Sequence, residues 1–148
     1  PQNINNAVLQ GFTLNYGGQI LGLKTTASYD YQNARNSDTG NVLPYRPANF
    51  GSLTIEKKNQ TWDLGGQMQV NGSQQTNPGN SYNTTLGGYT LFNVFGSLNL
   101  IKDVSLFLRG NNIFNKQYTN NATVSQWGNT YYRTPGSNFF VGLRFDTR

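Results

Sequence analysis

Apolar and polar side chains alternate along most of this chain, and this period of two limits what it can fold into more than any other feature. The alternation is clearest in two segments, where one parity carries the apolar set Leu21, Leu23, Ala27, Tyr29 and Tyr31, and then Trp62, Leu64, Met68 and Val70. Successive side chains of a strand point to opposite faces, so the pattern predicts strands with one apolar and one polar face. Weaker alternation recurs near 8–16, 52–56, 92–100, 104–111 and 139–145. We therefore predict an all-β, antiparallel fold with about seven strands.

Composition indicates what the apolar face contacts. Only 11% of the 148 residues are charged while 14% are aromatic, whereas soluble domains carry about 25% charged residues and disordered chains lack aromatic residues. The most apolar run, 104–108, contains Ser105 and falls far short of the roughly 18 apolar residues that a membrane helix needs. The composition therefore favours strands that cross a membrane, as in a transmembrane β-barrel.

Mid-strand charges all fall on the polar parity of their strands: Lys24, Asp30, Glu56, Asp63, Arg109 and Arg144. A charge facing lipid costs ~2–4 kcal/mol at the bilayer midplane, so a barrel requires this rule. The packed core of a soluble sandwich requires it too, and the periodicity leaves both architectures open.

The lengths of the connections separate the two architectures. Tight turns are predicted at Gly17-Gly18-Gln19, Lys58-Asn59 and Ile101-Lys102-Asp103, and they alternate with long loops at 32–49, 72–87 and 115–137. Outer-membrane barrels sort their connections in this way, with short turns in the periplasm and long loops outside. The pattern predicts a transmembrane barrel in which Pro1 to Ala7 lie in an extracellular loop.

Several function classes are disfavoured by the residues themselves. The chain has no Cys and no His, and its six acidic residues are scattered, without the pairing that a carboxylate dyad or a Ca²⁺ loop needs. The net charge of +5 comes from dispersed basic residues, which make a poor track for nucleic-acid phosphates. We expect no enzyme activity, no cofactor, no metal site and no nucleic-acid partner.

One segment carries a family resemblance. The run Asn111-Asn112-Ile113-Phe114-Asn115-Lys116-Gln117-Tyr118 resembles the N-L-F-D/N-K-x-Y signature near the end of TonB-dependent outer-membrane transporters. The last alternating segment also resembles the C-terminal strand that the barrel assembly machinery recognises, and its four apolar positions are Phe139, Val141, Leu143 and Phe145. Asp146-Thr147-Arg148 follows the expected terminal Phe145, which leaves open whether these three residues are native.

Within that family, the segments 27–36 and 43–48 look most like the vitamin B12 (cobalamin) receptors. Family members form a closed barrel of about 22 strands around a plug, and this chain resembles only the last seven or so. The resemblance therefore implies that residues 1–148 are the C-terminal portion of a receptor barrel in the cell outer membrane of a Gram-negative bacterium. The implied partners are the remaining N-terminal strands and plug, TonB acting through a TonB box on that plug, outer-membrane lipid and a small-molecule ligand.

The implied function is energy-coupled uptake of cobalamin or another scarce metal chelate. A siderophore-iron receptor, a passive porin and, at lower weight, a soluble β-rich carbohydrate-binding module remain alternatives.

Three residues are candidates for ligand contact: Arg46, Tyr131 and Tyr132. Flat aromatic rings and hydrogen-bonding side chains in long loops suit a large ligand arriving from outside. The structural alternative for each is loop bracing or anchoring at the membrane interface. For Asn112, Phe114 and Tyr118 the structural reading is favoured, with Asn turning the chain and the aromatics in the interfacial girdle.

Overall fold

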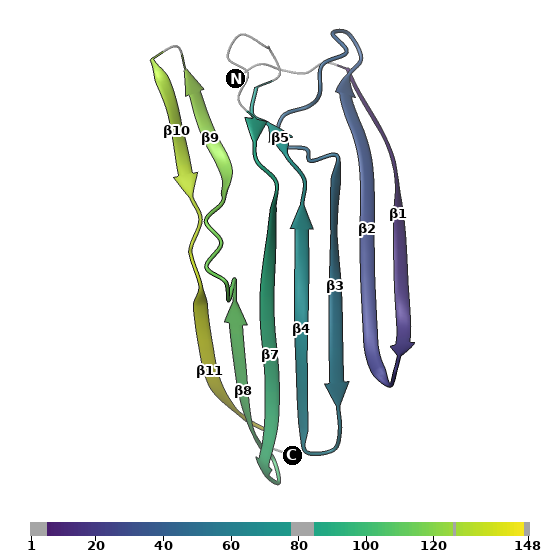
Figure 1. Ribbon diagram of the computed structural model, residues 1–148, viewed down its shortest axis with the longest axis vertical. Coiled ribbons are helices and arrows are strands. Elements are labelled where there is room, and N and C mark those ends of the chain that lie inside the picture. The colour runs from purple at the N-terminus through teal and green to yellow at the C-terminus, as the bar shows by residue number, and fades with distance from the viewer. Residues whose placement is uncertain (1–5, 78–84, 126, 147–148) are drawn as a thin grey trace.

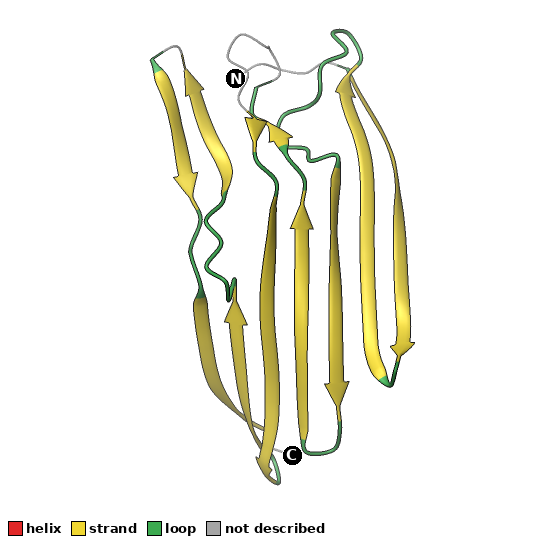
Figure 2. Cartoon of the chain, viewed as in Figure 1, coloured by secondary structure: helices red, strands yellow, loops and turns green. Residues whose placement is uncertain are grey.

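The computed structural model describes residues 6–77, 85–125 and 127–146, and within them every regular element is a β-strand (Figures 1 and 2). None of these described residues belongs to a helix that is long and apolar enough to span a membrane. The strands are β1 (Ala7–Ile20), β2 (Leu23–Asn36), β3 (Asn49–Lys58), β4 (Trp62–Asn71), β5 (Gln74–Gln75), β6 (Thr85–Leu86), β7 (Tyr89–Ile101), β8 (Val104–Asn111), β9 (Thr119–Ser125), β10 (Gly128–Arg133) and β11 (Asn138–Phe145).

Seven of these strands form one antiparallel sheet in the order β1-β2-β3-β4-β7-β8-β11. Each pairs with its neighbour in the chain once the short strands inside the loops are set aside, so the sheet is an up-and-down meander (Figure 1). The all-β antiparallel fold and the seven predicted wall strands are confirmed. A sandwich needs a second packed layer, whereas the described wall strands form a single layer.

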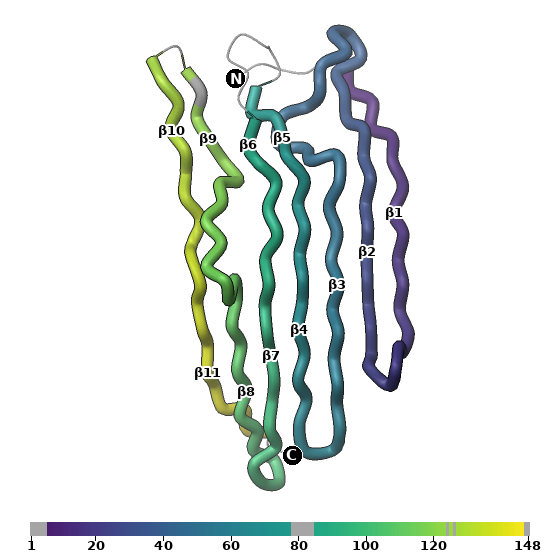
Figure 3. The backbone as a smooth tube through the Cα atoms, viewed as in Figure 1, coloured from purple at the N-terminus to yellow at the C-terminus, as the bar shows by residue number. Residues whose placement is uncertain are grey.

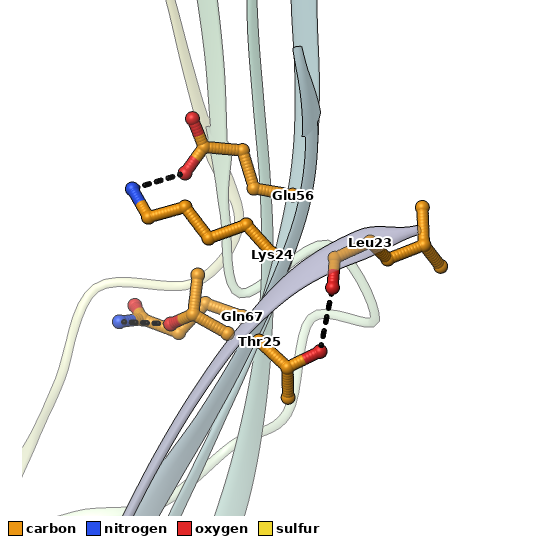
Figure 4. Close-up of polar contacts among 6 residues, drawn as sticks. Leu23, Lys24, Thr25, Glu56 and Gln67 are labelled. Carbon is orange, nitrogen blue, oxygen red and sulfur yellow. Dashed lines mark hydrogen bonds and ion pairs between the residues drawn. The ribbon is translucent and has the colours of Figure 1, made fainter. Parts of the chain in front are cut away.

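The register assigns every wall residue to one of two faces, because residues paired across antiparallel strands share a face. The apolar face carries rows such as Leu53, Met68 and Phe92. The polar face carries rows such as Thr54, Gln67 and Asn93. Figure 4 shows the two faces at the start of β2, where the side chain of Lys24 points to the polar side and that of Leu23 to the other.

All the predicted mid-strand charges lie on the polar face, where most of them have partners. The Nζ of Lys24 lies 3.2 Å from Glu56 Oε2 (Figure 4), and Ser97 Oγ donates to Asp63 Oδ2 at 2.6 Å. Arg144 Nε pairs with Asp146 Oδ1 at 2.9 Å. The parity inferred from the sequence is thus the parity that the register shows.

Four phenylalanines depart from this alternation, because the register places Phe50 and Phe140, and also Phe95 and Phe107, on the polar face; the last two pack on glycines. Each of these two rings covers a glycine of the neighbouring strand: a Cβ added to Gly65 would lie 2.3 Å from Phe95, and one added to Gly142 would lie 2.2 Å from Phe107. The glycines leave room for the rings to lie flat along the sheet. A simple pattern of apolar and polar residues did not predict these aromatic–glycine pairs.

The tight turns gather at one end of the sheet, which we call the turn end (Figure 1). The predicted turn at Gly17-Gly18-Gln19 is wrong, because β1 continues to Ile20 and the chain reverses at Leu21-Gly22. Both turn residues have positive φ, 52° and 76°, as a two-residue hairpin turn requires. Leu21 is therefore not a strand residue, and it is 97% exposed.

The other two turns lie close to their predicted places. The second reverses between Lys58 and Trp62, where Asn59 Oδ1 accepts hydrogen bonds from the backbone N–H groups of Thr61 and Trp62, both at 2.8 Å. The third separates Ile101 from Val104.

The long connections gather at the opposite end, the loop end (Figure 3). The first is shorter than predicted, 37–48 in place of 32–49, because β2 pairs with β1 as far as Asn36. The other two contain strands that the alternation did not reveal, namely the short pair β5–β6 and the hairpin β9–β10. Residues 1–5 and 78–84, part of the predicted extracellular segments, lie outside the described residues.

Candidate ligand-binding end of the sheet

The buried apolar side chains of the described residues lie at the loop end, three of them in the loops and one, Ala34, in the last part of the wall strand β2, away from the turn end. Among the described residues, those classed as buried hydrophobics are Ala34, Leu43, Leu86 and Ala122, each at most 8% exposed. They come from the end of β2, the 37–48 segment, β6 and β9. A single-layer wall has no interior to fill, so the packed part of the chain is this group of loops, which we call the cap.

Tyr45 connects the three loops of the cap. Its backbone N–H donates to Gln75 O at 2.8 Å, and its hydroxyl donates to Ala122 O at 2.7 Å. A third contact joins the later loops directly, because Gln74 Nε2 donates to Asn120 O at 3.1 Å. Segments far apart in the sequence are thus held together by hydrogen bonds to backbone carbonyls.

The β9–β10 hairpin extends the chain beyond the wall, above β8 and β11 (Figure 1). It carries the predicted ligand residues Tyr131 and Tyr132, which are 51% and 52% exposed, and Trp127 at its tip, which is 90% exposed. Aromatic side chains this exposed present a large contact area to a ligand or partner.

The structure places the three predicted ligand residues at the same end. Arg46 is exposed and directly follows Tyr45, while Tyr131 pairs across the hairpin with Ala122, the residue whose carbonyl Tyr45 binds. Arg46 and Tyr131 are therefore linked through Tyr45 and Ala122. Tyr132 lies next to Tyr131, and its hydroxyl is 3.4 Å from Thr123 Oγ1.

The signature segment forms a compact turn at the end of β8. Asn112 has a φ of 49° and is 5% exposed. Its side chain acts as both acceptor and donor, since Oδ1 accepts from the Lys116 N–H at 2.8 Å and Nδ2 donates to the Lys116 carbonyl at 3.0 Å. The Asn112 N–H in turn donates to Asn93 Oδ1 at 2.9 Å. The sequence predicted that Asn112 turns the chain, and this geometry agrees.

The remaining signature side chains spread to both sides of this turn. Phe114 packs edge-on against Phe92 on the apolar face, with ring centroids 5.2 Å apart, and the N–H of Ile113 donates to the Phe92 carbonyl. Tyr118 stacks on Tyr89 at 4.1 Å. Asn115, at a φ of 50°, accepts a hydrogen bond from the N–H of Ser137, which enters β11. The turn thus ties β7 and β8 to the approach to β11.

The four predicted apolar positions of β11 lie on the apolar face, whereas Phe140 pairs with Arg109 on the polar face. Phe139, Val141, Leu143 and Phe145 pair with Gly110, Leu108, Leu106 and Val104 of β8. They are between 54% and 73% exposed. Asp146 continues the pairing, since its N–H donates to Asp103 O at 3.0 Å, whereas residues 147–148 lie outside the described part of the chain.

The polar face is bridged by uncharged hydrogen bonds. Gln67 Nε2 donates to Thr54 Oγ1 (Figure 4) and Asn93 Nδ2 donates to Gln67 Oε1, so a chain of side chains runs from β3 through β4 and β7 to the signature turn. No three His, Cys, Asp or Glu side chains gather as a metal-ion site within the residues that the structure describes. The polar face is therefore suited to contact with water or with a polar partner.

Sequence reasoning missed two residues of this end, Tyr45 and Asn93. Tyr45 sits in a Leu43-Pro44-Tyr45-Arg46-Pro47 run whose charged Arg46 is the more conspicuous residue, and nothing local indicates hydrogen bonds to residues 30 or 77 positions away. Asn93 is 7% exposed but looks like any other polar-parity residue of a strand. The positive φ of Tyr45 could not be predicted, because tyrosine rarely adopts this conformation.

Comparison with known proteins decides the family. A family model described as "TonB dependent receptor-like, beta-barrel" matches residues 1–113, which is about three quarters of the chain. The chain belongs to this family. The match covers β1 to β8 and ends at Ile113, inside the signature turn.

A relative of this receptor barrel is the vitamin B12 transporter BtuB of Photobacterium profundum. The two are 25% identical over 134 residues, which are 90% of this chain and 22% of the relative. The receptor barrel chain thus spans about a fifth of the length of the curated relative that it matches.

Solved structures of receptor barrels show the same fold. The copper transporter OprC superposes with a TM-score of 0.77 at 25% identity, covering 94% of this chain and 24% of that one. The ferric enterobactin receptor PfeA of Pseudomonas aeruginosa gives 0.78 at 21% identity, covering 97% and 23%. The P. aeruginosa receptor FpvA bound to pyoverdine gives 0.77 at 19% identity, covering 94% and 19%.

Membership fixes the broad class of this receptor barrel. TonB-dependent receptors are transporters and receptors of the outer membrane, and they work with a plug and a ligand. The family is not an enzyme family. The apolar face of the seven-stranded sheet accordingly has the composition expected of a lipid-facing wall.

Proposed function

We propose that this chain is the C-terminal portion of a receptor barrel that imports cobalamin or a similar metal chelate with energy delivered through TonB. The observation that carries the ligand class is the similarity to a vitamin B12 transporter over 90% of the chain. The exposed aromatic hairpin and Arg46 at the loop end support it, because a large corrin-type ligand offers flat apolar surface and hydrogen-bonding groups.

In this proposal each part of the chain has one task. The apolar face contacts lipid, the polar face lines the lumen and meets the plug, the cap faces outside and binds the ligand, and the turn end lies in the periplasm. The apolar stripe of β11 acts as the assembly signal. TonB engages the plug, and the missing N-terminal strands close the barrel.

The residues that this chain offers suit a chelate better than a bare metal ion. Soft or borderline metals such as copper are held by Cys, His and Met, and this chain has no Cys, no His and one Met. A chelated metal brings its own ligands and needs only shape, aromatic contact and hydrogen bonds from the protein. Ferric siderophores share this property and are the second candidate, favoured by the superposition on ferric siderophore receptors.

Uptake by whole cells tests the proposal. The full-length receptor is expressed in a Gram-negative strain that lacks its own cobalamin receptor, and uptake of radiolabelled cyanocobalamin is measured with and without TonB. We expect uptake that needs both the receptor and TonB. Uptake of a ferric siderophore in place of cyanocobalamin establishes the second candidate, and uptake independent of TonB contradicts both in favour of a passive porin.

A further inference from the structure

The strongest unassigned feature is the pair of hydrogen bonds by which Tyr45 connects the loops of the cap, to Gln75 O and to Ala122 O. We call this pair the joint. We propose that Tyr45 is a positioning residue that fixes the three loops of the cap as one unit, so that Arg46 and the β9–β10 aromatic residues present a single preformed binding surface. The role goes beyond the ligand residues predicted from the sequence, because Tyr45 acts through the loops that it joins.

The first support is that each hydrogen bond of Tyr45 reaches a different loop. The backbone N–H binds Gln75 O in β5 and the hydroxyl binds Ala122 O in β9. Both acceptors are backbone carbonyls, so the joint holds the course of the loops and not only their side chains. Ala122 is 4% exposed and Tyr45 is 40% exposed, so the bond is shielded from competing water on the side of its acceptor.

The second support is the backbone conformation of Tyr45. Its φ is 56°, a left-handed region that a bulky residue rarely adopts unless the surrounding structure holds it there. Leu43, two residues earlier, is 8% exposed and its N–H donates to Ala34 O at 2.9 Å. The segment is thus anchored to β2 before Tyr45 turns toward the other two loops.

The joint has a direct consequence for binding. Arg46 follows Tyr45 in the chain, and Tyr131 is the cross-strand partner of Ala122. Loops that are already ordered lose less conformational entropy when a ligand binds, so a fixed cap binds more tightly than three independent loops. This step rests on the proposed ligand site, whereas the coupling between the loops does not.

The coupling is testable by a distance measurement in the full-length receptor. Nitroxide labels are placed on cysteines that replace Ser37, in the first loop, and Thr130, in β10; both side chains are exposed. Pulsed electron spin resonance then gives the distribution of distances between the two labels. In the parent receptor we expect one narrow distribution.

Tyr45→Phe removes one hydroxyl and keeps the ring. We expect the distribution to become at least twofold wider, because the bond to Ala122 O is lost. Tyr118→Phe is the matched control, since it removes a hydroxyl from the signature turn, outside the joint and away from both labels, and we expect no change. A distribution as narrow in Tyr45→Phe as in the parent overturns the proposal. Equal broadening in the control overturns it too.

A binding measurement separates this inference from the proposed function. Cyanocobalamin is the probe, and we expect Tyr45→Phe to raise its Kd about fivefold to tenfold while heat-resistant folding on gels is kept. If the parent does not bind cyanocobalamin but the labels still report loosening, the ligand assignment fails and the joint stands. If Tyr45→Phe binds the probe as tightly as the parent, Tyr45 does not position the site.

Discussion

At the scale of single residues, the effect of a substitution in the wall depends on the face of the sheet to which the side chain points. Adjacent positions have opposite requirements, because one faces the apolar side and the next the polar side. The pair Gly65 and Gly66 shows this within one dipeptide: Phe95 covers Gly65 on the polar face, while a Cβ on Gly66 would meet only the Asn93 carbonyl at 3.8 Å. Such pairs allow matched substitutions.

Replacing Gly65 by Ala should destabilise the receptor by about 1–2 kcal/mol, because the added methyl group displaces the Phe95 ring from the wall. Gly66→Ala should be neutral or slightly stabilising, since alanine restricts the unfolded chain. Unfolding in urea of the detergent-solubilised receptor, followed by gel mobility, compares the two. Equal losses of stability would show that the ring does not depend on Gly65.

Arginine introduced at Met68, on the apolar face, should cost ~2–4 kcal/mol and lower the amount of assembled receptor. The same residue at Gln69, on the polar face, should have little effect. The amount of heat-resistant protein in the outer-membrane fraction measures assembly. Similar defects at both positions would contradict the assignment of the faces.

At the scale of elements, the signature turn is a connection held by several hydrogen bonds to its own backbone and to β7. Asn112 combines a left-handed backbone conformation with two side-chain hydrogen bonds to Lys116. Asparagine is one of the few residues with a side chain that tolerates this conformation and can bond to the local backbone. Position 112 therefore favours asparagine for two separable reasons, the backbone conformation and the side-chain hydrogen bonds.

Substitutions at Asn112 separate these reasons. Asn112→Gly keeps the backbone conformation and loses the bonds, so it should cost about 1–2 kcal/mol. Asn112→Ala loses both and should cost roughly 1 kcal/mol more. Urea midpoints of the two variants give the difference. If alanine is no worse than glycine, the positive φ carries no cost at this position.

The wall was predictable from the sequence to a large extent, and the cap was not. The alternation of apolar and polar residues in a strand such as β4 shows that its two faces differ in polarity. This pattern can be recognised within the strand itself, without knowledge of its partners. The turn at Leu21-Gly22 was misplaced because two adjacent glycines, Gly17 and Gly18, look like a turn but remain extended and paired with Thr26 and Thr25. The cap depends on contacts between distant segments, such as Tyr45 with Ala122, which no periodicity encodes.

At the scale of the whole molecule, the sheet is open within the described residues. β1 and β11 each pair with one wall strand only, so each presents a row of unpaired backbone groups. In hydrocarbon each such group costs several kcal/mol, which strongly favours closure by further strands.

Residues 1–148 expressed alone should therefore aggregate or be degraded. Co-expression with the N-terminal remainder of the receptor should give a detergent-soluble complex that contains both polypeptides. Size-exclusion chromatography with detection of both pieces checks this. A monodisperse 148-residue monomer in detergent would reject the expectation and indicate a small barrel that closes on its own.

The orientation across the membrane is a further whole-molecule prediction. A single cysteine at Asn120, in β9, should react with an impermeant thiol reagent on intact cells, and one at Asn59, in the second turn, should not. Both positions are exposed, so accessibility of the side chain does not limit the reaction. Opening the outer membrane should make Asn59→Cys reactive as well, and the reverse labelling pattern would invert the orientation.

The concentration of buried apolar residues at the loop end bears on how such a protein can diversify. Many sequences satisfy the requirement of the wall for one apolar and one polar face, because each position needs only a side chain of the right polarity. The cap has its own small group of buried residues and its own joint. A mutation there should therefore change which ligand is recognised without preventing insertion of the wall into the membrane. We accordingly expect new specificities to arise by changes in the loops of the cap, while the pattern of faces in the wall and its contact with the cap at Ala34 are kept.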